Sequence, residues 1–266
     1  MKLLAINGSP RREKGNTQKL LASVLASAQS AGHTTKIMYL ADENPEPCEH
    51  CGHSCFTDGR CAREPKATLR SEAIQQAEGL ILGAPVYCWQ PNSLTCALFD
   101  KFRIPNGTWV DSSEPGIPAL GIAVAGGTGT GVFTALQSMY AWFCAWRFTP
   151  LHPVPVTRYN IDQVVADSGN IAGLFKPRED SVFTQKWDHM LLYDRLPFMS
   201  YGRVDEFEWL AREMAAFLER NGGNGQVLNE INSLLDRGGN AHRKGEEAET
   251  AQCYLSAFDA AYPHCR

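Results

Sequence analysis

The stretch KLLAINGSPRREKGNT, residues 2–17, places a short apolar run directly before a loop rich in glycine and polar residues. Lys2–Ile6 indicates a buried strand, because it is short, apolar and followed by the turn-forming Asn-Gly-Ser-Pro. After the loop, Thr17–Ser30 has leucine and valine at helical spacing. A strand, a glycine loop and a helix in this order are typical of the first unit of a parallel α/β sheet.

The rest of the first half repeats this alternation of strand and helix. The patterns predict further strands at 35–40, 79–83, 119–125 and 151–156, and helices at 66–77, 94–102 and 132–146. Prolines in the last of these strands suit only an edge or a strand end. Alternating strands and helices imply parallel pairing, and continuous apolar strands imply a sheet covered on both faces. We therefore expect a doubly wound α/β fold with a five-stranded parallel sheet.

The second half has a different organisation. Residues 158–204 show no clear period, and we interpret them as an insertion after the fifth strand. Asp205–Arg220 is an amphipathic helix ended by Asn-Gly-Gly, which can serve as the last helix of the core. Two more helical patterns, 226–236 and 246–260, flank the stretch RGGNAHRKG, which predicts a break. The sequence thus predicts a domain at 1–222 and a C-terminal helical extension at 223–266.

Charge, cysteine content and hydropathy exclude several classes of protein. The 266-residue chain has a net charge of −4 and scattered cations, so it has no basic footprint for nucleic acid. Met1 leads directly into the first strand without a secretory signal, which favours the cytoplasm and makes disulfides the weakest interpretation of the nine cysteines. The uncharged run 115–146 is interrupted by GGTGTG, which indicates a strand, a loop and a helix rather than a membrane span.

The loop Asn7–Thr17 has the features of a phosphate site. A glycine-containing loop that enters a helix presents free backbone N–H groups and the positive end of the helix dipole. Arg11 and Arg12 add cationic donors. The loop matches neither G-x-x-x-x-G-K-S/T nor G-x-G-x-x-G, so it does not indicate a nucleoside triphosphate or a standard dinucleotide site. The alternative interpretation is an ordinary turn with its N-cap at Asn16 or Thr17.

Two further loops follow predicted strands and reach the same edge of the sheet. Residues 83–89, GAPVYCW, contain two aromatic side chains that can border a flat ring. Residues 126–131, GGTGTG, let the backbone approach a ligand closely. In open α/β sheets, ligands bind beyond the carboxyl ends of the strands, where the strand order reverses. The three loops together therefore predict one ligand site.

These residues resemble the NADPH-dependent FMN reductase branch of the flavodoxin-like superfamily, over about residues 1–157 and the helix 205–220. The resemblance rests on GSPRREKGNT, on ILGAPVYCWQPNS and on the glycine loop, and it implies a flavodoxin-like fold with FMN as cofactor. The chain departs from the family at Cys96, where Lys is usual, and at Asp100-Lys101, where Asp-Arg is usual. The implied phosphate ligands are Ser9, Arg11, Asn16 and Thr17, with Gly15 in the same loop; the implied isoalloxazine contacts are Pro85, Val86, Tyr87, Cys88, Trp89 and Asn92, with Gly126, Gly127 and Thr128 at the far edge.

Four cysteines lie within the fourteen residues CEHCGHSCFTDGRC: Cys48, Cys51, Cys55 and Cys61. Iron–sulfur flavoproteins of the same family have a compact cysteine motif in this place, so the resemblance implies a 4Fe–4S cluster held by these four thiolates. The second gap is one residue longer than in the usual C-x2-C-x2-C spacing. Two alternatives stay open: a loop without a metal, and a zinc ion for which His50 or His53 replaces one thiolate.

The resemblance implies hydride transfer from NAD(P)H to flavin N5, and then transfer to a small-molecule acceptor or a redox protein. This chemistry needs no general acid or base, so we name no catalytic side chain. Alternatives are a flavodoxin-like electron carrier without NAD(P)H activity of its own, a cluster-free quinone reductase, and a metal-stabilised module without flavin. We expect a homodimer or tetramer without nucleic-acid or membrane partners. The aromatic stripe at 140–148 indicates either core or a subunit interface.

Overall fold

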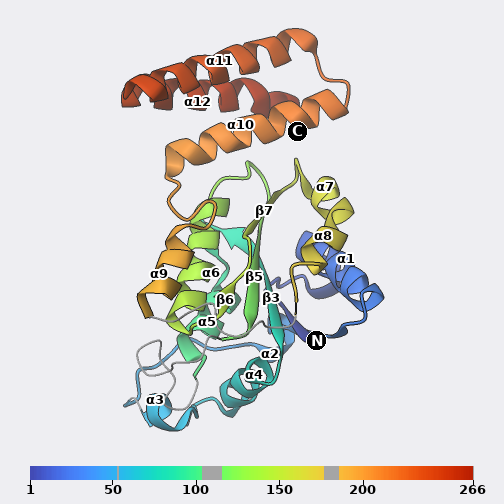
Figure 1. Cartoon of the computed structure of the whole chain (residues 1–266), viewed down its shortest axis with the longest axis vertical. Coiled ribbons are helices and arrows are strands. Elements are labelled where there is room, and N and C mark those ends of the chain that lie inside the picture. The colour runs from blue at the N-terminus through green and yellow to red at the C-terminus, as the bar shows by residue number, and fades with distance from the viewer. Residues whose placement is uncertain (53, 104–115, 177–185, 266) are drawn as a thin grey trace.

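The structure, a computed structural model, describes residues 1–52, 54–103, 116–176 and 186–265, with only the backbone described for 186–189 (Figure 1). None of the described helices is long and apolar enough to cross a membrane. The strands are β1 (Lys2–Asn7), β2 (Thr34–Tyr39), β3 (Gly79–Tyr87), β4 (Gln90–Pro91), β5 (Pro118–Ala125), β6 (Thr149–Pro150) and β7 (Val154–Thr157). The α-helices are α1 (Asn16–Ser30), α2 (Leu40–Glu43), α3 (Ser54–Asp58), α4 (Pro65–Gln75), α5 (Ser93–Lys101), α6 (Val132–Ala145), α7 (Ile161–Ala166), α8 (Ser168–Ala172), α9 (Lys186–Asp194), α10 (Arg203–Arg220), α11 (Gly225–Lys244) and α12 (Glu247–Ala261).

The centre of the molecule is a parallel sheet in the order β2-β1-β3-β5-β6. In this sheet Leu82 of β3 pairs with Ile6 on one side and with Gly121 on the other. The parallel strand β7 also pairs with β5, and β4 pairs antiparallel with the end of β3. The predicted five-stranded sheet is confirmed, but its fifth position is shared by β6 and β7 instead of one strand at 151–156. The strand is interrupted between Pro150 and Val154, a stretch that includes Pro153.

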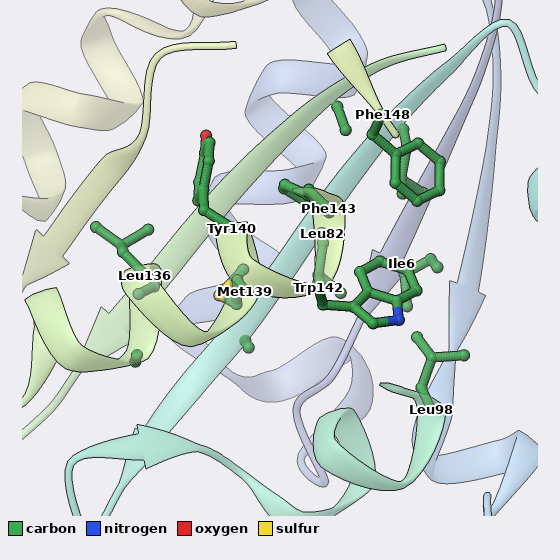
Figure 2. Packing of buried hydrophobic residues seen from close by; sticks show 14 of the residues in the cluster. Ile6, Leu82, Leu98, Leu136, Met139, Tyr140, Trp142, Phe143 and Phe148 are labelled. Carbon is green, nitrogen blue, oxygen red and sulfur yellow. The ribbon is translucent and has the colours of Figure 1, made fainter. Parts of the chain in front are cut away.

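Helices cover both faces of the sheet, because successive strand residues point to opposite sides. Leu4 and Ile6 of β1 pack in a cluster with α4, α5 and α6, whereas Leu3 and Ala5 pack with α1, α7 and α8. Part of the predicted insertion, α7 and α8, therefore completes one face of the sheet. Figure 2 shows the other face, where buried aromatic side chains of the stripe 140–148 pack beside the sheet, so that this stripe belongs mainly to the core.

The helices α10, α11 and α12 form a layer of their own at one end of the molecule (Figure 1). The predicted break at 237–245 is wrong, because α11 continues through it and ends only at Gly245, whose φ is +75°. At Gly238 an added Cβ would lie 2.4 Å from the Tyr254 ring, so the glycine lets α12 pack closely against α11. The predicted domain boundary at residue 222 stays a prediction.

Candidate flavin site and cysteine cavity

The first turn of α1 is open to a ligand. Its N-cap is Gly15, and no side chain in the described part of the chain caps this turn. Lys19 N donates to Gly15 O at 3.2 Å, so the N–H groups of Asn16 and Thr17, earlier in the turn, have no acceptor within the helix. The alternative of an ordinary N-cap at Asn16 or Thr17 is therefore wrong. These open donors and the helix dipole suit an anion.

A buried asparagine shapes the loop before α1. Asn7, the last residue of β1, accepts a hydrogen bond from Ser9 N at 2.8 Å and donates to Gln18 Oε1 at 2.9 Å. Ser9 Oγ accepts from Arg11 N at 3.2 Å and lies 3.0 Å from where a Cβ at Gly15 would be. The loop therefore holds Ser9 close to the open turn, and a larger residue at Gly15 would displace it.

The two arginines of this loop differ in their contacts. Arg12 pairs with Asp42 and donates to Ala41 O at 3.2 Å, which ties it to α2. Arg11 is exposed, and among the described residues it forms no ion pair. Of the two arginines, Arg11 is thus the one that no described ion pair holds in place, and its predicted contact with a phosphate stays a prediction.

The end of β3 forms a tight hairpin with β4. Tyr87 pairs with Gln90, and between them Cys88 and Trp89 have φ values of 49° and 68°. Both values lie in the left-handed region, which such turns usually fill with asparagine or glycine, so the backbone is strained. The Tyr87 side chain is 49% exposed, and the Arg203 guanidinium lies 5.3 Å from the Trp89 ring. The aromatic residues predicted to border a ring thus stand at a strained, partly solvent-facing tip.

A buried polar contact joins the hairpin to the first loop. Asn92 donates from Nδ2 to Gly8 O at 2.7 Å, and its Oδ1 accepts from Thr95 Oγ1 at 2.7 Å. A Cβ at Gly8 would lie 2.3 Å from Thr95 Oγ1, so only glycine permits this approach. Asn92 therefore fixes the position of the loop Asn7–Thr17 relative to the hairpin.

The glycine loop after β5 meets the same hairpin. A Cβ at Gly131, where φ is +86°, would lie only 2.5 Å from Trp89 Cα. Gly126 and Gly127 are exposed, and a Cβ at either position would meet no atom within 4 Å. Thr128 Oγ1 lies 2.9 Å from Thr130 Oγ1 and is partly buried. The predicted second and third loops are therefore in contact, and the exposed glycines leave space beside them.

A carboxylate from the C-terminal layer caps α6. Glu206 of α10 is 2% exposed and accepts hydrogen bonds from Gly131 N at 3.0 Å and Phe133 N at 2.9 Å. Burial raises the pKa of this carboxyl, and the backbone hydrogen bonds oppose that rise. The N-terminus of α6 is thus already occupied by a negative charge, whereas that of α1 is open. Of these two helix N-termini, that of α1 is the one with free N–H donors for the anionic end of a ligand.

The structure brings the three predicted loops together and adds residues that the sequence pattern does not indicate. Asn7, Thr95 and Glu206 hold the loops without being predicted as site residues. A polar residue that ends an apolar strand is a signal for Asn7, but nothing local in the sequence points to Glu206. The combination of open N–H donors, an exposed aromatic tip and unobstructed glycines fits FMN, which has a phosphate at one end and a flat ring at the other.

The four cysteines line one cavity of about 150 Å³, which is also bordered by α3 and by the end of α5. Cys48 and Cys51 are exposed, Cys55 and Cys61 are partly buried, and all four are free thiols. Among the described residues, no three His, Cys, Asp or Glu side chains are already arranged to hold a metal ion. His53 lies outside the described residues. The donor set fits a thiolate-bound metal centre, although the ligand positions are not preassembled.

A buried ionic network lies next to this cavity. Lys101, the last residue of α5, lines the cavity and donates to Glu64 Oε2 at 2.8 Å, while Arg70 pairs with Glu64 Oε1. Burial would raise the pKa of Glu64, but the two cations outweigh it and lower that pKa. Burial likewise opposes ionisation of Lys101, but its pair with Glu64 prevails and raises the pKa of Lys101. Lys101 therefore stays charged beside the thiols.

The chain is similar to known flavoproteins in sequence and in fold. The sequence model of the family described as NADPH-dependent FMN reductase matches residues 1–158. An iron–sulfur flavoprotein of Methanocaldococcus jannaschii is 32% identical over 144 residues, which are 54% of this chain and 72% of that protein. An iron–sulfur flavoprotein of Methanosarcina thermophila is 27% identical over 143 residues, or 53% of this chain and 72% of that protein.

A crystal structure of an azoreductase aligns with this chain with a TM-score of 0.52 and 15% sequence identity. The alignment covers 66% of this chain and 100% of the azoreductase chain. At that identity the likeness supports the flavodoxin-like fold alone. The family match includes the three loops and the four cysteines, and it ends before α7 and the C-terminal layer.

Proposed function

Since this chain belongs to the NADPH-dependent FMN reductase family, we propose that its three loops hold one FMN, with the phosphate on the first turn of α1. The predicted activity is confirmed at the level of the family: the protein is a flavin-dependent oxidoreductase with NADPH as co-substrate. When bound, FMN supplies the redox chemistry, accepting hydride at N5 and passing the electrons on. The chain binds and orients the cofactor.

The open first turn of α1 is the observation on which the phosphate position rests. The N–H groups of Asn16 and Thr17 and the hydroxyl of Ser9 converge there, and Arg11 can add a positive charge. A phosphate in this place accepts charge-assisted hydrogen bonds without displacing any capping side chain. Riboflavin, which has no phosphate, forms none of these bonds.

The isoalloxazine ring lies, in this proposal, against the hairpin tip and beside the exposed glycines of the third loop. Tyr87 and Trp89 provide flat apolar contact area, and Gly126 and Gly127 leave the ring edge accessible to backbone N–H groups. Asn92 keeps the tip at a fixed distance from the phosphate loop. The tip remains partly solvent-facing, so a nicotinamide and an acceptor can reach the same place in turn.

Binding of FMN and riboflavin to the apo-protein tests the phosphate position. Loss of one hydrogen bond to a charged group costs about 1.5–3 kcal/mol, so Ser9→Ala should weaken FMN binding by roughly tenfold or more. Riboflavin affinity should stay unchanged in the same variant. The matched control is Ser30→Ala at the other end of α1, where Ser30 Oγ donates to Ala26 O of its own helix. Equal affinity of wild-type protein for the two flavins would refute the phosphate position.

We further propose that the four cysteines hold a 4Fe–4S cluster, and that the acceptor is a one-electron redox protein. Support comes from four thiols on one cavity and from the sequence relatives, which are iron–sulfur flavoproteins. The helix α5 connects the two places: it begins after Asn92 in the flavin site and ends at Lys101 in the cavity. Nine helical residues span about 13 Å, a short path for an electron.

Iron and sulfide analysis of anaerobically purified protein tests this second proposal. Wild-type protein should contain about four irons and four sulfides per chain. Cys55→Ser should lose them, while Cys88→Ser, which changes an exposed cysteine of the flavin hairpin, should retain them. NADPH-driven reduction of a one-electron protein acceptor should fail in Cys55→Ser. Wild-type protein that reduces quinones but contains no sulfide would instead be a cluster-free quinone reductase.

A further inference from the structure

Cationic side chains are buried beneath the cysteine cavity in excess of the anionic ones. Arg70, Lys101 and Arg103 are 2%, 5% and 8% exposed, and the one buried carboxylate that the described residues place near them is Glu64, which pairs with Arg70 and Lys101. Among the described residues, no carboxylate pairs with Arg103. Within the described part of the chain, three buried cations therefore face a single buried anion, which leaves a net excess of two buried positive charges.

Arg103 is held at the cavity wall in a specific way. Its NH1 donates to Phe102 O at 2.7 Å, its Nε is buried and has no hydrogen-bond partner among the residues that the structure describes, and the side chain lines the cavity. Its guanidinium carbon lies 4.2 Å from the centre of the Phe56 ring, and Phe56 follows Cys55 directly in α3. The aromatic contact thus links the arginine to the cysteine segment, at the end of the molecule opposite α10–α12 (Figure 1).

The exposed charges nearby do not resolve this imbalance. Glu49 and Arg63 also line the cavity, but they pair with each other at 3.5 Å and more than half of each side chain is exposed. Glu46 contributes its backbone N–H to Glu64 and is itself exposed to water. A buried charge is costly unless a neighbouring opposite charge compensates it, and solvated carboxylates compensate weakly. Neutral thiols provide no compensation at all.

We propose that Arg103 and Lys101 are the counter-ions of a thiolate-bound cluster in this cavity and raise its reduction potential. This inference rests on the proposed cluster. Four thiolates around a 4Fe–4S core of charge 2+ have a net charge of −2, which matches the net excess of two positive charges among the described buried side chains. Reduction adds one electron, supplied by flavin that NADPH has reduced, and makes the centre more negative. Buried positive charge therefore stabilises the reduced form.

Potentiometric titration of the cluster in Arg103→Met tests this role. The variant should shift the equilibrium constant of reduction at least tenfold toward the oxidised form, which is 59 mV for a one-electron couple. Arg103→Lys, which keeps the charge, should recover most of the wild-type potential. The matched control is Arg63→Met, which removes the same charge from an exposed, paired position of the same cavity and should change the constant less than about threefold.

A change in potential in Arg103→Met should not come from unfolding, because the substitution leaves no described carboxylate without a partner. Unfolding by urea checks this, and Lys101→Met, which leaves Glu64 paired with Arg70, provides a second measurement of the same kind. A cluster whose potential is the same in Arg103→Met, Lys101→Met and Arg63→Met overturns this inference and leaves the proposed function intact. Wild-type protein without iron and sulfide overturns both.

Discussion

Removal of the Glu206 carboxylate should destabilise the proposed flavin site, although Glu206 itself lies in α10. Glu206 lies in α10, outside the residues that match the family, yet its two oxygens accept from Gly131 N and Phe133 N at the start of α6. In Glu206→Ala both buried N–H groups lose their acceptor. The loop from Gly126 to Gly131 then loses the contact that fixes its end, so both stability and FMN binding should suffer.

The magnitude follows from the two hydrogen bonds. Each bond to a charged group contributes about 1.5–3 kcal/mol, which gives about 3–6 kcal/mol for the pair. Burial raises the pKa of Glu206, which means that desolvation of the carboxylate offsets part of this contribution. We therefore expect a loss of about 2–4 kcal/mol in Glu206→Ala. Glu206→Gln retains one acceptor oxygen and should lose about half as much.

Urea unfolding of the apo-protein, followed by circular dichroism, measures these losses, and fluorescence titration with FMN measures the effect on the site. Glu219→Ala is the control, because Glu219 is exposed in the last turn of the same helix and should change stability by less than about 0.5 kcal/mol. If Glu206→Ala unfolds at the same urea concentration as Glu219→Ala, the carboxylate does not hold the loop and the reasoning is wrong.

Two further predictions concern packing and pH. Gly238→Ala should destabilise the protein by about 1–3 kcal/mol, because the new methyl would lie 2.4 Å from the Tyr254 ring. Gly239→Ala, whose nearest neighbouring atom is 3.8 Å away, should instead stabilise α11 by up to about 1 kcal/mol, and thermal unfolding that finds equal effects would contradict this packing. Glu64→Gln should be less stable than wild type at neutral pH. The folded-state pKa of Glu64 is lowered, so its contribution is present above the unfolded value of about 4.3 and is lost as pH falls through the folded value. The stability difference should thus begin to shrink as the pH falls below about 4.3 and close once the pH is below the lowered folded-state pKa, and a difference that stays constant on acidification would argue against the ion pairs.

Local patterns were sufficient to predict the sheet and its helices, because they are properties of neighbouring residues. The apolar run of β1 and the helical spacing of α1 are visible without knowledge of the fold. The continuation of α11 through Gly238 is not visible in the sequence. Gly238 favours a break in an isolated helix, whereas in the folded protein Tyr254 packs against it. The split of the fifth strand into β6 and β7 depends likewise on which N–H groups face β5.

The candidate site was predictable to the extent that its loops follow strands at one sheet edge. The hairpin at Cys88 and Trp89 was not predictable from the sequence, because both residues adopt left-handed backbone conformations that their residue types rarely take. Glu206 reaches α6 from more than seventy residues away in sequence, and such a long-range contact leaves no local pattern. The charge imbalance beneath the cysteines likewise becomes visible only when Arg103 and Glu64 are placed together in space.

The most direct test of the account is an anaerobic visible spectrum of the purified protein, recorded before and after addition of NADPH. Protein that binds FMN across the three loops should show oxidised flavin bands that NADPH bleaches, and the cofactor released on denaturation should be FMN. Folded protein that neither retains flavin nor takes up added FMN would contradict the central claim.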